Sequence, residues 1–234
     1  MSPSNLEILA YEESPLGPLC LRRRELLSRP GTVVTEVTLN HAFLMSSYNT
    51  ASERALASVA VQMHPGTDLR VLVGGRGLGY TAHAALASPR VARVEVVEFL
   101  PQVVDWMEQG LFPLAAALQA DMRFSTAAGD VYARLAAAPN ERWDLILIDV
   151  DHAPDDQLSR TNDAFYRAEG LERASRHLAP GGILGVWSYA ESSPFADALH
   201  QVFQEVRIEP VTFFNEMIDE EVTDWLFFAR GAPR

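Results

Sequence analysis

Apolar residues recur along the chain in short runs that are separated by stretches with helical spacing. The runs at 69–75 (LRVLVGG), 91–99 (VARVEVVEF) and 143–150 (WDLILIDV) are almost continuously apolar, which is typical of strands buried on both faces. Comparable runs follow at 181–189, 206–214 and 223–230. Helices are predicted near residues 48–63, 81–88, 101–119, 163–178 and 194–204. This alternation predicts a mostly parallel sheet with helices on both faces.

The two ends of the chain depart from this alternation. Residues 7–45 read as short strands separated by the turn sequences SPLG and SRPG, so we expect an N-terminal β appendage over 1–45. No helix-length segment separates the last two apolar runs, which predicts an antiparallel pair at one sheet edge. The fold prediction is therefore a Rossmann-like α/β domain over 46–234 with seven strands.

Composition narrows the function classes. The formal net charge of −12 argues against a protein that tracks nucleic-acid phosphates, because that role requires a basic face. No apolar run approaches the roughly 18 to 20 residues of a membrane-spanning helix, and the first residues lack the pattern of a signal peptide. Cys20 is the only cysteine, so an internal disulfide is excluded. We expect a soluble cytoplasmic protein that binds neither membrane nor nucleic acid.

Candidate chemistry begins at the glycine-rich segment that follows the run at 69–75. Gly74, Gly75, Gly77 and Gly79 join a predicted strand to a predicted helix. Glycines at such a turn permit positive φ angles and let a ligand approach the backbone, while the helix N-terminus favours an anionic group. Several nucleotide-binding folds share this feature, so it does not identify a ligand alone.

Acidic residues follow three further predicted strands. Glu98 ends the run at 91–99, about 20 residues after the glycine loop, where a carboxylate can accept both hydroxyls of a ribose. Asp130 follows a short strand, and Asp149 ends the run at 143–150. Ligands of open α/β sheets bind beyond the carboxyl ends of the strands. These acids and the glycine loop therefore predict one shared crevice.

With these motifs in place, the sequence resembles the spermidine synthase-like branch of the class I methyltransferase fold. The segment VLVGGRGLGYTA is similar to the glycine motif of that branch, VEVVEFLPQVVDW to its ribose motif, and AAGDVYARL to its adenine motif. The segment WDLILIDVDHAP is similar to its catalytic strand, and LAPGGILGVWS to its Pro-Gly-Gly turn. The resemblance implies a transferase that uses S-adenosylmethionine or its decarboxylated form.

Carried over residue by residue, the resemblance assigns roles to the crevice. It implies that the loop with the four glycines contacts the methionine moiety of the cofactor. It also implies that Glu98 binds the ribose hydroxyls and that Asp130 lies near the adenine amino group. Asp149 would hold and deprotonate the nucleophile. Asp151 is the second acid that can be assigned to the catalytic loop.

Two departures from the family pattern bear on the transferred group. The glycine loop of the family carries an acid that binds the amine of the decarboxylated cofactor, whereas this chain has Arg76 and Gly77 there. A guanidinium in place of a carboxylate suits a cofactor that keeps its own carboxylate, so we expect Arg76 to bind intact S-adenosylmethionine. In addition, Ala51 and Ser52 precede Glu53 where polyamine synthases carry Tyr-His, which puts classical putrescine recognition in doubt.

Other residues near the catalytic loop allow more than one interpretation. Asp151, His152, Asp155 and Asp156 could bind a divalent metal, but solvated acids are the simpler interpretation and no metal is predicted. His152 is a candidate general base or substrate contact, against a structural role. Tyr189, Trp187 and Phe165 could wall the substrate pocket, although aromatic residues beside a strand also form core.

Three functions remain open from the sequence. The first is methyl transfer from S-adenosylmethionine to a small-molecule amine or hydroxyl. The second is aminopropyl transfer from the decarboxylated cofactor, as in polyamine synthesis. The third is a non-catalytic nucleoside-binding module, against which Asp149 argues. The exposed edges expected for the appendage further predict a homodimer.

Overall fold

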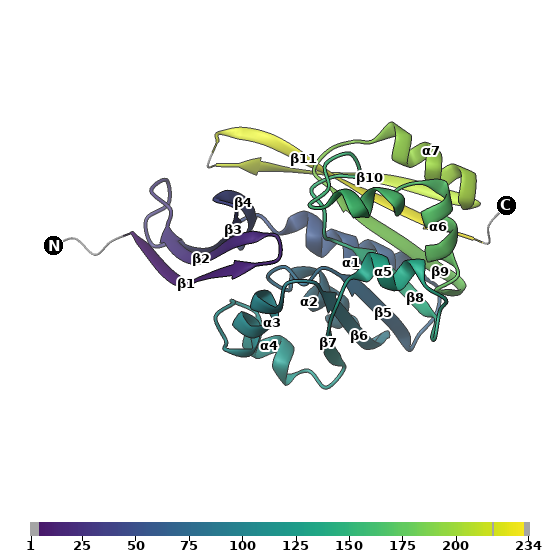
Figure 1. The fold of residues 1–234 in the computed structure, drawn as a ribbon, viewed down its shortest axis with the longest axis horizontal. Coiled ribbons are helices and arrows are strands. Elements are labelled where there is room, and N and C mark those ends of the chain that lie inside the picture. Colours follow the sequence, from purple (N-terminus) through teal and green to yellow (C-terminus); the bar gives the residue numbers. More distant parts are fainter. Residues whose placement is uncertain (1–4, 217, 232–234) are drawn as a thin grey trace.

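Two β-sheets organise the computed structural model, which describes residues 5–216 and 218–231 (Figure 1). The smaller sheet is antiparallel, has the order β1-β2-β3-β4 and is the predicted N-terminal appendage. Its strands are β1 (Leu6–Ser14), β2 (Gly17–Glu25), β3 (Val33–Leu39) and β4 (Ala42–Ser46). β1 lies at its edge with Ile8 and Tyr11 exposed. The homodimer expected to cover such an edge stays a prediction.

The larger sheet has seven strands in the order β10-β11-β9-β8-β5-β6-β7. Five of them are parallel, while β11 pairs antiparallel with both β9 and β10. The predicted α/β fold, including adjacent parallel strands at 69–75 and 91–99, is therefore confirmed. The strands are β5 (Leu69–Gly74), β6 (Val91–Glu98), β7 (Phe124–Ala128), β8 (Trp143–Ile148), β9 (Leu178–Ser188), β10 (Glu205–Asn215) and β11 (Glu220–Arg230).

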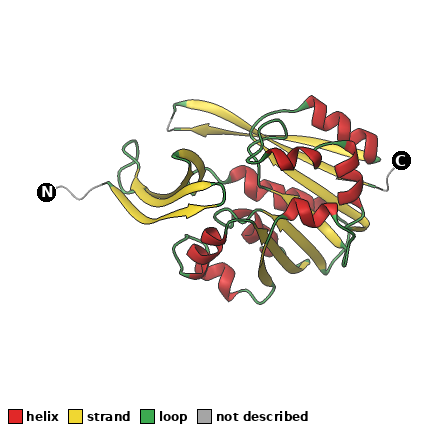
Figure 2. Cartoon of the chain, in the orientation of Figure 1, coloured by secondary structure: helices red, strands yellow, loops and turns green. Residues whose placement is uncertain are grey.

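Helices cover both faces of this sheet (Figure 2). They are α1 (Ala51–Met63), α2 (Tyr80–Leu86), α3 (Pro101–Glu108), α4 (Ala115–Ala120), α5 (Val131–Ala136), α6 (Ala168–Ser175), α7 (Ser193–Val202) and the 3-10 helix η1 (Arg160–Ala164). The helix predicted around 101–119 is two helices, because the chain turns at Gly110 with a φ of 76°. The helical segment predicted at 163–178 begins earlier as η1, continues as α6 and ends at residue 175.

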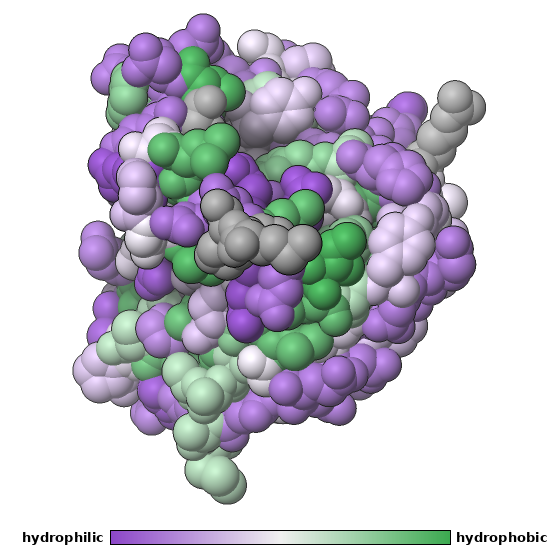
Figure 3. Space-filling view, turned by 90° about the vertical axis from the view of Figure 1, so that its left-hand side faces the viewer, coloured by the Kyte–Doolittle hydropathy of each residue, from purple (hydrophilic) through white to green (hydrophobic). Residues whose placement is uncertain are grey.

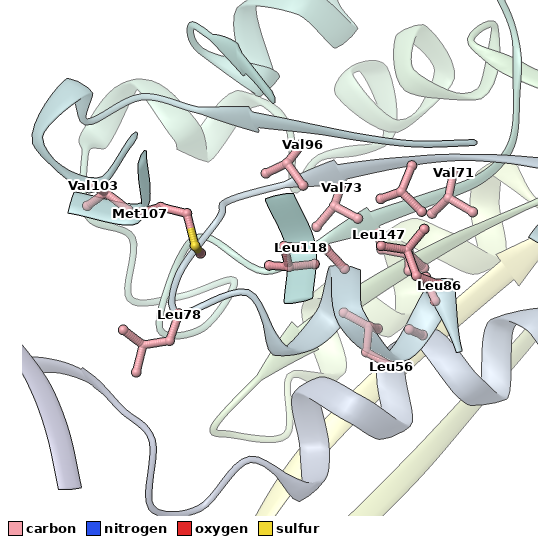
Figure 4. Packing of buried hydrophobic residues seen from close by; sticks show 14 of the residues in the cluster. Leu56, Val71, Val73, Leu78, Leu86, Val96, Val103, Met107, Leu118 and Leu147 are labelled. Atoms are coloured by element: carbon pink, nitrogen blue, oxygen red, sulfur yellow. The ribbon is translucent and has the colours of Figure 1, made fainter. Parts of the chain in front are cut away.

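The apolar side chains form one core on each face of the sheet. Val71 and Val73 of β5 pack with Leu56 of α1, whereas Leu72 between them packs into the opposite core, as strand alternation requires (Figure 4). The first core extends to the appendage through Leu19 and Leu21. The two sheets are thus joined by shared apolar burial.

The strand order reverses between β5 and β8, which places a crevice at the carboxyl ends of these strands. On one side of it, β4 leads into α1; on the other, the β10–β11 hairpin extends past the sheet toward the appendage (Figure 1). Arg29 of the β2–β3 turn forms an ion pair with Glu216 at the hairpin tip. No helix among the described residues is both long and apolar enough to span a bilayer.

Candidate functional site

A cavity of about 470 Å³ occupies the crevice. Its lining includes the glycine loop after β5, the carboxyl ends of β6 and β8, the start of α5, the first turn of α1 and the β10–β11 hairpin. A volume in this range is typical of small-molecule and cofactor sites. The predicted crevice is therefore present, and it extends further toward the appendage than strand ends alone indicate.

The glycine loop fits closely against the neighbouring strand. At Gly75, with a φ of +85°, a Cβ would lie 2.1 Å from the backbone oxygen of Asp149, so any side chain would separate the loop from β8. At Gly79, with a φ of +94°, a Cβ would lie 2.5 Å from Leu118. These contacts explain why the segment needs glycine before any ligand is considered.

Glu98 lies at the carboxyl end of β6, and its carboxylate organises the loop. One oxygen accepts a hydrogen bond from the backbone N–H of Arg76, and the other from the N–H of Leu100, both at 2.8 Å. Burial raises the pKa of Glu98, and these backbone donors oppose that shift. Each carboxylate oxygen has a second lone pair, so Glu98 retains the capacity to accept ribose hydroxyls.

Asp130 caps the helix that follows β7. Its Oδ1 accepts hydrogen bonds from the N–H groups of Tyr132 at 2.8 Å and Ala133 at 3.2 Å, which is the usual geometry of an aspartate N-cap. Asp130 also lines the cavity next to Val97 and Gly129. The capping bond fixes this carboxylate at the same end of the cavity as Glu98.

Asp149 follows β8, where the strand order reverses, and is half-buried in the lining of the cavity. Its Oδ2 accepts a hydrogen bond of 2.7 Å from the Thr81 hydroxyl of α2. Burial raises the pKa of Asp149 to about 6, while the Thr81 bond lowers it and the charge of Asp224 raises it. A carboxyl that titrates near neutrality beside a cavity is suited to accept a proton.

Two acids that the sequence interpretation did not place at the site lie beside Asp149. Glu53 comes from the first turn of α1 and Asp224 from the middle of β11, and both line the cavity. The buried hydroxyl of Ser52 bridges them, at 2.5 Å from Asp224 and 3.2 Å from Glu53. A lone aspartate in the apolar strand TDWLFFAR was a usable signal for Asp224. We call Glu53, Asp149 and Asp224 the acidic corner.

Ionising the carboxyls of the acidic corner costs free energy in the folded protein, because they are close together and poorly solvated. Burial and the nearby charge of Asp149 raise the pKa of Glu53 to about 8, and burial raises the pKa of Asp224. Among the described ion pairs, none includes a member of the corner. A cationic ligand would supply the missing positive charge.

Known proteins resemble the chain over part of its length. No family model matches it. Putrescine N-methyltransferase 2 of Nicotiana tabacum is 33% identical over 123 residues, which cover 53% of this chain and 33% of that enzyme. Polyamine aminopropyltransferase 2 of Streptomyces coelicolor is 33% identical over 129 residues, which cover 53% of this chain and 23% of that protein. The matched region thus spans about a third or less of either relative.

The solved structures extend the comparison to nearly the whole chain. A spermidine synthase in complex with the transition state analogue AdoDATO superposes with a TM-score of 0.75 and 17% identity, over 95% of this chain and 73% of that one. The chain has the spermidine synthase-like fold. This fold is a branch of the class I methyltransferase fold, so the predicted resemblance and its small N-terminal sheet are confirmed.

Within the spermidine synthase-like fold, the Arg76 side chain contacts β7. Its guanidinium donates a hydrogen bond of 2.7 Å to Thr126 and lies 5.4 Å from the ring centre of Phe124, both on β7. Arg76 is 6% exposed, and burial lowers the pKa of its guanidinium. The side chain of Arg76 thus packs against β7 and its backbone N–H donates to Glu98, while Arg76 also lines the cavity, so its pairing with the cofactor's carboxylate stays a prediction.

Asp151 is held by several hydrogen bonds within the fold. It is 2% exposed, and its carboxylate accepts hydrogen bonds from both Tyr132 and Tyr166, at 2.7 and 2.9 Å. The amide of Asn162 and the N–H of Leu158 donate to the same carboxylate. These donors orient Asp151 in the loop after β8, and because Asp151 also lines the cavity its role in catalysis or substrate binding stays a prediction.

The other residues that the sequence suggested as substrate contacts lie partly at the cavity and partly in the core. His152, Tyr189 and Trp187 line the cavity, whereas Phe165 is buried in the core against Tyr132. Asp155 and Asp156, considered as metal ligands, accept hydrogen bonds from Ser192 and Tyr189. Within residues 5–216 and 218–231, no group of three or more potential ligands is arranged to hold a metal.

Replacing Glu53 with Gln should stabilise the ligand-free protein, mainly at high pH. The pKa of Glu53 rises on folding from 4.5 to about 8, so its contribution to stability is lost as the pH rises through that window. At pH 5 the folded-state carboxyl is protonated but the unfolded-state carboxyl is already partly ionised, so the variant should be more stable by less than about 1 kcal/mol. At pH 9, above both pKa values, we expect a gain of up to about 5 kcal/mol, seen as a melting temperature higher by roughly 10 °C or more.

Thermal unfolding at both pH values measures this effect. Glu172→Gln, an exposed position on α6, is the matched control and should leave the melting temperature unchanged at either pH. An equal shift for Glu53→Gln at pH 5 and pH 9 would show that its charge is not what destabilises the corner.

Proposed function

We propose that this protein transfers an alkyl group from an S-adenosylmethionine-type cofactor to the nitrogen of an amine. The observation that carries the proposal is the position of Asp149, whose carboxyl has a pKa raised to about 6 and lines the same cavity as Glu98 where the strand order reverses. Methyl transfer from intact S-adenosylmethionine is the first candidate. Aminopropyl transfer from the decarboxylated cofactor is the second.

The residues of the cavity fit such a cofactor. Glu98 would accept the ribose hydroxyls, Asp130 would lie near the adenine, and the glycine loop leaves room for backbone contact with the ligand. When bound, the cofactor supplies a carbon activated by its sulfonium group. The protein then has to align the nucleophile and to accept a proton.

Asp149 has two tasks in the proposed reaction. As a carboxylate it attracts the ammonium form of the amine and orients the nitrogen. It then accepts a proton, because an ammonium has no lone pair and must become a neutral amine before it can attack carbon. The pKa of Asp149, about 6, lies closer to the pKa of an amine than the ordinary aspartate value of 3.8 does, which makes the proton transfer easier. Overall, one proton leaves per alkyl group transferred.

Separate observations favour each transferred group. The absence of a carboxylate at Gly77 favours intact S-adenosylmethionine, which carries its own carboxylate, and the putrescine N-methyltransferase relative is consistent with this. Conversely, Arg76 is turned to β7, and the acidic corner suits the purely cationic tail of the decarboxylated cofactor. The aminopropyltransferase relative supports that alternative.

Product analysis tests the proposal directly. The protein is incubated with either cofactor form and a set of primary amines, and the released nucleoside is identified by mass spectrometry. S-adenosylhomocysteine indicates methyl transfer, and methylthioadenosine indicates aminopropyl transfer. Release of neither, from protein shown to bind a cofactor, would refute alkyl transfer to an amine and support a nucleoside-binding role.

Gly77→Asp should shift cofactor preference toward the decarboxylated form by about tenfold, a difference of about 1.4 kcal/mol. The new carboxylate would attract the ammonium tail of that form and repel the carboxylate of intact S-adenosylmethionine. A Cβ at position 77 would meet only Met45 Sδ, at 3.6 Å, and the strain of the local φ of +49° is smallest for aspartate and asparagine, so Gly77→Asp and Gly77→Asn carry the same strain.

Calorimetric titration of both cofactor forms gives the ratio of affinities. Gly77→Asn has nearly the same shape without the charge and should leave that ratio unchanged. Equal ratios for the Asp and Asn variants would mean that position 77 does not face the cofactor tail.

A further inference from the structure

The cavity has an apolar mouth between the appendage and the β10–β11 hairpin. Figure 3 views the end of the molecule that carries the appendage and shows several apolar residues among hydrophilic ones on this face. The mouth is walled by side chains from β4, the β4–α1 connection, the loop before η1 and β10. These side chains are Phe43, Met45, Tyr48, Leu158 and Phe213, and Trp187 borders the acidic corner, because its indole N–H lowers the pKa of Asp224.

Several of these side chains are left partly open to solvent. Phe43 is 56% exposed, and Tyr48 and Phe213 are half-buried. Partly exposed aromatic side chains around one concavity are typical of a site that buries an apolar part of a ligand. The mouth is therefore suited to an uncharged, ring-sized group.

The carboxylates that line the cavity lie away from the apolar mouth. Among the described residues, six carboxylates line the cavity. Glu98 and Asp130 lie at the end expected to hold the cofactor, and the carboxylate of Asp151 is occupied by its hydrogen-bond donors. The other three form the acidic corner, where Ser52 links two of them through one hydroxyl. The acceptor part of the cavity thus has one anionic end and one apolar end.

The acids nearest the mouth do not line the cavity and already have partners, which for Glu216 include Tyr48 of the mouth. Glu216 pairs with Arg29. Asp155 and Asp156 accept hydrogen bonds from Ser192 and Tyr189. Phe213 also lines the cavity, and it lies two residues nearer the hairpin tip than Val211, the register partner of Asp224, on the same face of β10 as Val211. A charge placed against these apolar side chains would lose hydration without gaining a partner.

We propose that the acceptor is a primary monoamine with an aromatic body, whose ammonium group binds the acidic corner and whose ring binds the apolar mouth. This inference rests on the proposed function and names its substrate class. It also separates this chain from its relatives, whose names refer to the diamine putrescine and to polyamines.

Three amines isolate the two parts of the proposal. Butylamine and putrescine have the same carbon chain and differ by one terminal ammonium group, while phenethylamine adds a ring. We expect butylamine to exceed putrescine in kcat/KM by about tenfold, and phenethylamine to exceed butylamine by a further factor of about ten, mainly through KM. A higher kcat/KM for putrescine than for butylamine would overturn the inference.

A negative charge placed at the mouth should shift the preference from butylamine toward putrescine. Phe213→Asp provides the missing carboxylate, so the ratio of putrescine to butylamine kcat/KM should rise at least about tenfold. Phe214→Asp is the matched control: it adds the same charge to the next residue of β10, whose side chain is 51% exposed and does not line the cavity. An equal rise in both variants would reflect general attraction of a dication and would contradict the assigned position.

Binding measurements separate this inference from the proposed function. Affinities for the three amines are measured by calorimetry in the presence of S-adenosylhomocysteine, which requires no turnover. If phenethylamine binds most tightly but no amine is alkylated, alkyl transfer is refuted and the amine-binding site stands. If amines are alkylated but putrescine binds most tightly, alkyl transfer stands and the monoamine inference is refuted.

Discussion

Asp149→Asn should lower kcat by about 10²- to 10⁴-fold while the protein keeps its fold and its affinity for the cofactor. The amide oxygen can still accept the hydrogen bond that Thr81 donates, so the local geometry is maintained. What is lost is the negative charge that attracts the amine and the site that accepts its proton. Single-turnover kinetics at saturating amine measure the loss, and calorimetry checks cofactor binding.

The pH dependence of kcat gives a second test of the same residue. Asp149 must be ionised to accept a proton, so kcat should fall about tenfold per pH unit below its pKa of about 6 and level off above it. Thr81→Val removes the donor that stabilises the carboxylate. Because that bond lowers the pKa of Asp149, its loss should move the acid limb to higher pH.

Two outcomes would contradict the assignment. Full activity of Asp149→Asn would show that another group accepts the proton, with Glu53 the nearest alternative in the acidic corner. An acid limb that stays in place in Thr81→Val would show that the limb reports a group other than Asp149.

Residues that end apolar runs were placed correctly by the sequence. Gly75, Glu98 and Asp149 each follow a run that is buried on both faces, and such runs form the parallel strands of a sheet. Parallel strands carry their carboxyl ends to one edge, so residues at those ends converge whatever the helices between them do. Strand position alone is therefore enough to predict the crevice.

Side-chain direction was not predictable in the same way. Arg76 and Asp151 lie next to site residues in sequence, but their partners, Thr126 on β7 and Asn162 on η1, come from segments whose proximity only the tertiary fold defines. Glu53 was noted from the sequence only as part of a departure from the family motif. It meets Asp224, 171 positions away, through Ser52, whose hydrogen bond to Asp224 spans 172 positions. Nothing in local periodicity links a helix N-terminus to the middle of the last strand.

Glu98→Ala should weaken cofactor binding by on the order of 2 to 4 kcal/mol, because a ribose loses the acceptor of two charge-assisted hydrogen bonds. The structure adds a cost that the sequence did not indicate. The same carboxylate holds the backbone N–H groups of Arg76 and Leu100, so its removal should also loosen the glycine loop and lower the melting temperature. Glu98→Ala therefore combines two effects that a control must separate.

Glu95 provides that control because it lies on the same strand, is also buried and takes part in ion pairs with Arg93 and Arg134 away from the cavity. Glu95→Ala should lower the melting temperature while leaving cofactor affinity within about twofold, since the residue does not line the cavity. Calorimetric titration well below both melting temperatures compares the two variants in their folded states. Equal affinities for Glu98→Ala and the wild type would remove Glu98 from the cofactor site and restrict it to organising the loop.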